Sequence, residues 1–312
     1  GGKMKRKELK ISPVPEDSKF YFIYAHILLL WPFTPFIFAA IYWLFIGDKT
    51  RSIIIEQFMK EIHSNKIKAE SKEKKDITIV IHDLRTGMTP TLGFSIKSQL
   101  GGNSTLFNAG KTTNFAFSIV GHTFTEAEID EINAIDTSSK IRDRVKKING
   151  LGGTLCFKMM DDTICYNNFV LIDSCLPHIM ANILVESNQA NTKNLKEVTE
   201  QVATINPLNY DTTYNQQFYT HKVKNFLVAA ALGMVPHTPW NGTYQANGGY
   251  LVVKDDGDVL CYHFYDRNLF EDYLYCNTKL ETPSSSRYEF GKLYKNEANE
   301  LCFKLNLQVR FK

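Results

Sequence analysis

Apolar and polar residues alternate along residues 76–83 and along residues 92–99, and this period of two predicts two β-strands. The connecting residues include Gly87 and Pro90, which favour a turn. We therefore expect the two strands to pair in antiparallel fashion. The second strand is expected to have an apolar face of Phe94 and Ile96 and a polar face of Ser95, Lys97 and Gln99.

The rest of the chain mixes helical and strand patterns. Helical periodicity predicts helices over about residues 52–63, 177–187, 195–205 and 219–232, and Thr125 followed by Glu128 predicts the start of another helix. Strand patterns predict a strand over residues 113–120, a hairpin over 155–167 that turns at Asp161 and Asp162, a hairpin over 249–265 that turns at Asp256 and Gly257, and a final strand over 304–311. These elements together predict an α/β (α+β) fold with a β-rich C-terminal part.

An uncharged apolar stretch covers residues 20–46 and follows a basic segment. Its length satisfies the requirement for a membrane span with the basic flank on the cytoplasmic side. Pro32 and Pro35 would kink such a helix, and Lys49 and Arg51 weaken the charge asymmetry. Three readings stay open: a membrane tether, an interfacial hairpin, or a leading segment that does not belong to the folded domain.

The composition, with 44% hydrophobic and 22% charged residues, is that of a globular protein and excludes a disordered chain. The net charge of +3 permits a nucleic-acid partner but does not require one. Lysines crowd into residues 60–75, which form either a solvated linker or an edge that faces phosphates. The cysteines are too far apart for a zinc-binding pair. The N-terminus carries no cleavable secretory signal, so we expect reduced thiols in a cytoplasmic protein, with a disulfide framework as the alternative.

Asp76 and Lys97 carry the candidate chemistry. If the chain turns at residue 87 or 88, antiparallel pairing places Asp76 opposite residues 98–99, within reach of Lys97. In metal-dependent phosphodiester hydrolysis, such a carboxylate holds Mg²⁺, the metal activates water, and the lysine offsets developing negative charge. The position two before the lysine is usually acidic in these sites, whereas it is Ser95 here. The spacing alone is weak, because a hairpin whose polar face meets solvent matches it equally well.

Longer blocks of sequence are more specific. Residues 74–115, 248–294 and 304–312 resemble the HpaII-type restriction endonuclease family, a branch of the PD-(D/E)XK nuclease superfamily. The resemblance implies a mixed central sheet flanked by helices, with Asp76 as the metal ligand and Ser95, Lys97 and Gln99 as further catalytic residues. We expect three regions: a basic and hydrophobic N-terminal segment (1–49) that is a possible membrane span or a segment outside the family, a catalytic core (50–150), and a helical and β-rich remainder that recognises DNA (151–312).

The function that the resemblance implies is Mg²⁺-dependent cleavage of unmethylated double-stranded DNA by a type II restriction endonuclease. The family's best-known member reads CCGG, so we expect a short, GC-rich palindrome. A palindrome implies a homodimer, and the family implies a companion DNA cytosine methyltransferase in the same restriction-modification system.

One departure from the family pattern keeps other functions open. Members normally begin with a Gly-Glu-Trp-Ser-Glu-like helix that supplies a supporting carboxylate, and this chain has no such segment. Glu56 or Glu61 is a substitute, or else both glutamates are plain surface residues. The alternatives are therefore a DNA-binding protein with a defective active site and a membrane-tethered binding protein.

A further group of residues is expected to contact DNA. Small residues after the second strand allow backbone N–H groups to approach phosphates, although a loop without DNA contact explains them equally well. Arg287 is the first candidate for reading a base, with a structural ion pair as its alternative. The polar face of the final strand, which includes Asn306, is a weaker candidate because a solvated face explains it equally well. The complete predicted set is Gly101, Asn103, Ser104, Thr105, Lys111, Asn114, Arg287, Gln308 and Arg310.

Overall fold

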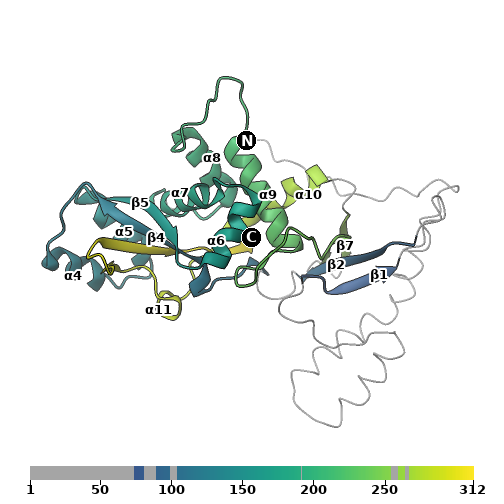
Figure 1. The fold of residues 1–312 in the computed structure, drawn as a ribbon, viewed down its shortest axis with the longest axis horizontal. Helices are drawn as coiled ribbons and strands as arrows, with labels where there is room; N and C mark the ends of the chain where they lie inside the picture. Colours follow the sequence, from purple (N-terminus) through teal and green to yellow (C-terminus); the bar gives the residue numbers. More distant parts are fainter. Residues whose placement is uncertain (1–73, 81–88, 99–103, 191, 254–258, 264–266) are drawn as a thin grey trace, which may run out of the picture. The chain divides into compact units, whose positions relative to one another are not determined.

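The computed structural model describes residues 74–80, 89–98, 104–190, 192–253, 259–263 and 267–312 (Figure 1). Two compact units divide the chain: residues 70–78 with 92–312, and residues 1–69 with 79–91. Nearly all described residues belong to the first of these units. Several predictions fall outside the described residues: the apolar stretch 20–46, the helix 52–63 with Glu56 and Glu61, and the site residues Gln99, Gly101 and Asn103.

The described strands form three sheets. The first has the order β1 (Ile77–Val80), β2 (Thr91–Ser98), β6 (Gly249–Val253) and β7 (Val259–His263). The second has the order β5 (Thr154–Met160), β4 (Asn114–Val120), β10 (Leu301–Asn306) and β9 (Leu293–Lys295). The third has the order β3 (Thr105–Phe107), β11 (Val309–Phe311) and β8 (Thr278–Leu280). Because β2 pairs with β6 in parallel and β6 pairs with β7 in antiparallel fashion, the first sheet is mixed.

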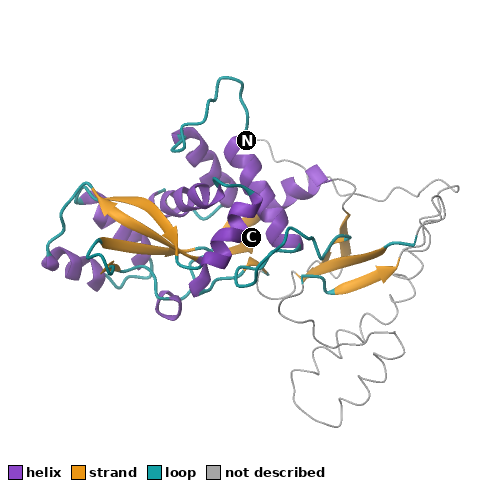
Figure 2. Cartoon of the chain, viewed as in Figure 1, coloured by secondary structure: helices purple, strands orange, loops and turns teal. Residues whose placement is uncertain are grey.

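Groups of helices stand between groups of these strands along the chain, and Figure 2 shows both kinds of element. They are α4 (Glu126–Ala134), α5 (Lys140–Gly150), α6 (Thr163–Ile172), α7 (Leu176–Gln189), α8 (Leu195–Ile205), α9 (Phe218–Leu232), α10 (Arg267–Asn277) and α11 (Ser285–Tyr288), with a short 3₁₀ helix, η3 (Lys111–Thr113). Helices α6 and α7 pack against β5, and α9 packs against α8 and α10. The expected mixture of helices and strands is confirmed.

Several individual elements were also predicted correctly. Helices α7, α8 and α9 lie within two residues of their predicted bounds, and β4 matches the strand expected near residue 113. At the start of α4, the Glu128 backbone N–H donates to Thr125 Oγ1 and the Thr125 N–H donates to Glu128 Oε2. This capping box satisfies two backbone donors that the helix leaves unpaired, as the sequence pattern predicted.

Two predicted elements were wrong. The hairpin over residues 155–167 is instead strand β5 followed by α6, because the Asp162 side chain accepts a hydrogen bond from the Cys165 N–H at 2.8 Å and caps that helix. The final strand over residues 304–311 is divided between β10 and β11, which belong to different sheets. The Leu307 N–H still donates to the Thr113 carbonyl in the register of the β10–β4 pairing, and the chain beyond it pairs with β3 and β8 as β11.

A cluster of phenylalanine rings holds distant parts of the chain together. The centroids of Phe107, Phe169 and Phe226 lie 5.1 to 5.9 Å apart, and Phe115 lies 6.1 Å from Phe169. All four side chains are fully buried. Since they come from β3, β4, α6 and α9, one core joins residues on both sides of position 150.

The described cysteines Cys156, Cys165, Cys175, Cys276 and Cys302 are free thiols, as expected. Among the described residues, no single helix is long and apolar enough to cross a membrane, although α6 and α7, bent by 106° at their junction, reach that length and apolar character together.

The phenylalanine cluster predicts a large local cost of cavity formation. Phe169→Ala is expected to lower the free energy of unfolding by about 3–5 kcal/mol, because the ring is fully buried among three other rings. Leu171 lies on the same helix and is 54% exposed, so Leu171→Ala is expected to change that free energy by about 0.5 kcal/mol or less. Urea unfolding followed by circular dichroism measures both. Equal costs for the two variants would contradict this account of the core.

Candidate active site

Asp76 is held against β2 by three hydrogen bonds. Its backbone N–H donates to the Phe94 carbonyl at 2.7 Å. Its Oδ2 accepts hydrogen bonds from Ser95 Oγ at 3.0 Å and from the Ile96 N–H at 2.5 Å. The carboxylate therefore lies beside residues 94–96, with a side chain that remains exposed to solvent.

This position corrects the predicted register, which had placed Asp76 opposite residues 98–99. Strand β1 ends at Val80 and β2 begins at Thr91, so the midpoint of their connection falls between residues 85 and 86 rather than at residue 87 or 88. In an antiparallel pair, moving the turn by about two residues moves every pairing by about four. The sequence correctly predicted that Asp76 lies close to residues 95–97. It did not correctly predict which residue lies directly beside the carboxylate.

Burial along β2 does not follow the predicted division into an apolar and a polar face. Ser95 is 1% exposed, while Ile96, expected in the core, is 38% exposed. The exchange follows from the neighbouring strand, because the parallel pairing of β2 with β6 places Ser95 opposite Tyr250. The Ser95 hydroxyl tolerates burial because it donates to Asp76.

Tyr250 also supports Lys97. The Lys97 Nζ lies 5.5 Å from the centre of the Tyr250 ring, within the range of a cation–π interaction. Tyr250 is fully buried, and its hydroxyl donates to the Ala231 carbonyl at 2.9 Å, which fixes the ring. Burial lowers the pKa of Lys97, and the negative charge of Asp76 opposes that shift.

Lys74 is a second lysine at this site that the sequence analysis did not single out. Its backbone N–H donates to Gln245 Oε1 at 2.7 Å, and its Nζ donates to the Leu106 carbonyl at 3.4 Å. Burial lowers its pKa to about 8, the charge of Lys97 lowers it further, and the charge of Asp76 raises it. One carboxylate therefore lies within the electrostatic influence of two lysines.

A signal for Lys74 was present in the sequence. Lys74 stands two positions before Asp76, and residues two apart in an extended chain point to the same side. The lysine-rich composition of residues 60–75 concealed it, because every lysine in that stretch had the same two interpretations. Only the contacts with Gln245 and Leu106 distinguish Lys74 from its neighbours.

Close backbone packing between β2 and residues 245–248 supports the site. The Gly93 N–H donates to Asn247 Oδ1 and the Gly248 N–H donates to the Gly93 carbonyl, each at 2.7 Å. A Cβ atom at residue 93 would lie 2.4 Å from the Gln245 carbonyl oxygen, so only glycine allows this approach. The same packing brings Gln245 to the backbone of Lys74.

The donor chemistry around Asp76 fits a magnesium ion with few protein ligands. Within the described residues, no group of three or more His, Cys, Asp and Glu side chains is arranged to hold a metal ion. Mg²⁺ is commonly held by one or two carboxylates together with water and substrate phosphate oxygens, so a single exposed aspartate meets the minimum requirement. Glu56 and Glu61, the suggested sources of a second carboxylate, lie outside the described residues.

The expected DNA contacts occupy different environments. Arg287 is exposed on α11 and makes no ion pair with any described residue, so its alternative role as a structural ion pair finds no support in this part of the chain. Lys111 is exposed but forms an ion pair with Glu289. Partly exposed positions near or within the small third sheet are occupied by Ser104, Thr105, Gln308 and Arg310.

Asn114 has a structural role in place of the expected DNA contact. It is 1% exposed, its Nδ2 donates to the Tyr288 carbonyl at 2.9 Å, and its Oδ1 accepts a hydrogen bond from Asn306 Nδ2 at 2.7 Å. Asn306, placed on the solvated face by its alternation, is 5% exposed and also donates to the Gly110 carbonyl. Both side chains are occupied in the interior, so neither is available to DNA in this structure.

Comparison with known proteins gives one consistent family. The model of the HpaII restriction endonuclease family matches residues 48–311. The chain is 48% identical over 266 residues to the Type II restriction enzyme HpaII of Haemophilus parainfluenzae, an alignment that covers 85% of this chain and 73% of that protein. No solved structure matches the chain. Since the family match includes the β1–β2 segment with Asp76, Ser95 and Lys97 as well as the C-terminal sheets, the chain belongs to the HpaII restriction endonuclease family.

Proposed function

We propose that this chain is a type II restriction endonuclease that hydrolyses phosphodiester bonds in unmethylated double-stranded DNA with Mg²⁺ held at Asp76. The observation that carries the proposal is the contact of Asp76 with the 95–97 segment, which brings a carboxylate and two lysines to one place. The 48% identity to a protein named Type II restriction enzyme HpaII supports it. With this chemistry we also assign the fold to the PD-(D/E)XK superfamily.

Each side chain has a distinct task in this reaction. The hydrogen bonds from Ser95 and the Ile96 N–H fix one oxygen of Asp76 and keep the carboxylate in one orientation. A bound Mg²⁺ supplies Lewis-acid polarisation of the scissile phosphate and activation of a water molecule. Lys97, positioned by the Tyr250 ring, offsets the negative charge that develops on the phosphate oxygens.

Ser95 acts as a positioning residue in this proposal. Its hydroxyl is buried and donates to Asp76, so it orients the existing carboxylate instead of supplying the second negative charge that an acidic residue would. Lys74 adds a second positive charge near the same carboxylate. Gln99 stays a predicted catalytic residue and lies outside the described residues.

DNA recognition is assigned to polar residues of the C-terminal half and to residues that follow β2 in the sequence. Arg287 is the first candidate, because a guanidinium without an ion pair among the described residues is available to donate to guanine. Ser104, Thr105, Lys111, Gln308 and Arg310, together with Gly101 and Asn103, stay predicted contacts. A GC-rich palindrome, a homodimer and a companion methyltransferase are part of the same proposal.

One observation favours a second function, that of a DNA-binding protein that does not cut. Within the described residues, no group of three or more His, Cys, Asp and Glu side chains could hold a metal ion. The family pattern, in contrast, leads us to expect a carboxylate that supports Asp76. The two functions differ in one measurement, because the second predicts DNA binding without cleavage under all metal conditions. The membrane-tethered alternative depends on residues 20–46, outside the described part of the chain.

Cleavage of DNA tests the active-site assignment. With Mg²⁺ and unmethylated phage DNA, the full chain is expected to give discrete bands, and Lys97→Gln is expected to slow cleavage by about 100- to 1000-fold because a charge-stabilising group is lost. Asp76→Asn is expected to remove detectable bands, because the metal loses its carboxylate. Asp130→Asn and Lys146→Gln, at exposed positions of α4 and α5, make the same charge changes elsewhere and are expected to cut normally.

The outcomes of that experiment separate the two functions. Normal cutting by Asp76→Asn would refute the assignment of the metal ligand. A wild-type chain that retards DNA in a gel but never cuts it would select the non-cutting binding protein.

Nuclear magnetic resonance titration tests whether the three charges are close together. In the metal-free protein, the ε-methylene signal of Lys74 is expected to titrate near pH 8. Asp76→Asn removes a negative charge that favours the protonated amine, so it is expected to lower the pKa of Lys74. Lys97→Gln removes a positive charge that disfavours the protonated amine, so it is expected to raise that pKa. Shifts of the same sign in both variants, or a comparable shift in Lys146→Gln, would show that this arrangement is incorrect.

A further inference from the structure

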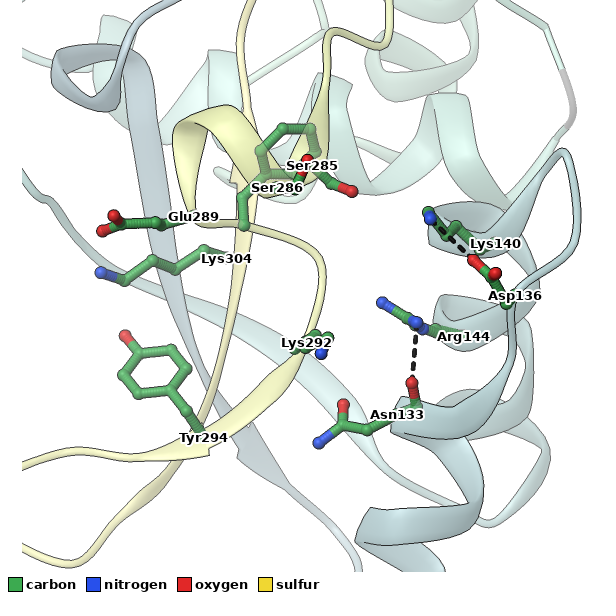
Figure 3. Close-up of a pocket in the computed structure, with 11 residues that line it drawn as sticks. Asn133, Asp136, Lys140, Arg144, Ser285, Ser286, Glu289, Lys292, Tyr294 and Lys304 are labelled. Carbon is green, nitrogen blue, oxygen red and sulfur yellow. Dashed lines mark hydrogen bonds and ion pairs between the residues drawn. The ribbon is translucent and has the colours of Figure 1, made fainter.

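A polar cavity of about 620 Å³ lies between the α4–α5 region and the α11–β9–β10 region of the chain (Figure 3). None of its lining residues belongs to the proposed active site. Charged residues dominate its wall: Lys140, Arg144, Lys292 and Lys304 are cationic, and Asp136 and Glu289 are anionic. Its volume lies in the range of small-molecule binding sites.

The two carboxylates of the cavity are already neutralised. Asp136 accepts an ion pair from Lys140 at 2.7 Å, and this contact lowers the pKa of Asp136. Glu289 forms an ion pair with Lys111, which lies outside the lining. Lys304 is also occupied, because it pairs with Asp161 at 2.8 Å. The positive charges that remain are those of Arg144 and Lys292.

Arg144 is a buried cation that lacks a carboxylate partner within the described residues. It is 3% exposed, and its guanidinium donates to the carbonyls of Gly291, Asn133 and Ile135 at 2.5, 2.8 and 2.6 Å. Its Nε has no hydrogen-bond partner among these residues. The Asp136 carboxylate forms no ion pair with Arg144, but its charge opposes the lowering of the Arg144 pKa by burial. Because Asp136 is already paired with Lys140, a net positive charge remains beside the adjoining space.

Lys292 and Ser285 provide accessible donors beside this charge. Lys292 is exposed and makes no hydrogen bond or ion pair with the described part of the chain, and the Ser285 hydroxyl likewise has no partner there. Ser286 adds a second hydroxyl, which lies 3.2 Å from that of Ser284. Figure 3 shows Arg144 extending from α5 toward Lys292, with the two serines at the other side of the space.

We propose that this cavity binds a phosphate group. Lys292 and the hydroxyl groups of Ser285 and Ser286 would contact the phosphate oxygens, and the Arg144 charge behind them would stabilise the bound anion. The phosphate comes either from the backbone of DNA or from a free nucleotide. With DNA as the source, the inference rests on the proposed function, and the exposed Arg287 on the same helix as the serines favours that source.

The salt dependence of DNA binding tests the first source. Binding of a short duplex to the full chain is measured by fluorescence anisotropy in EDTA, so that no cleavage occurs. Loss of one phosphate contact is expected to reduce the slope of log K against log salt by about 0.9, and Lys292→Gln is expected to show that reduction and weaker binding to every sequence. Lys146→Gln removes the same charge from an exposed position outside the cavity and is expected to leave the slope unchanged.

Titration with thymidine 5′-monophosphate tests the second source. Perturbation of the Ser285 amide signal in the wild-type chain but not in Lys292→Gln, with an unchanged DNA slope, would assign the cavity to a free nucleotide. An unchanged DNA slope together with no perturbation that depends on Lys292 would overturn the proposal. A wild-type chain that fails to bind DNA refutes the proposed function. The monophosphate titration then tests separately whether the cavity binds a phosphate group.

Discussion

The carboxylate of Asp76 is the constraint on which the candidate site depends. By accepting hydrogen bonds from Ser95 and the Ile96 N–H, it fixes where the start of the first strand lies along β2. It also supplies the negative charge that opposes the lowered pKa values of Lys74 and Lys97. Without this contact, Lys74 would keep the unfavourable charge interaction with Lys97 and lose the favourable one with Asp76.

Two polar side chains of this site, Ser95 and Tyr250, are buried on neighbouring strands. Ser95 tolerates burial through its hydrogen bond to Asp76, and Tyr250 through its hydrogen bond to Ala231. Burial weakens the hydration of the lysines and thereby strengthens their attraction for a phosphate oxygen. The same low-polarity surroundings that make the lysines costly in the free protein would make them effective toward an anionic substrate.

Buried polar contacts also organise the other half of the molecule. Asn114 and Asn306 bridge neighbouring strands and hold the backbone of η3 through the Gly110 carbonyl. Arg144 performs a comparable task, since it gathers three carbonyls from two segments around one guanidinium. In both cases, side chains connect backbone segments that are distant in sequence. For Arg144, burial is unfavourable because the positive charge forms no ion pair with a described carboxylate.

Residue order alone determined the features that depend on near neighbours. The capping box of α4, the helices near residues 180, 200 and 225, and the placement of Asp76 close to the 95–97 segment follow from spacing along the chain. The tertiary structure decided which residues are buried and which charges meet. Lys74 reaches Gln245, Asn114 reaches Asn306, and Arg144 reaches Gly291 across more than a hundred residues. Local periodicity carries no information about such partners, because they are selected only when the sheets and helices pack together.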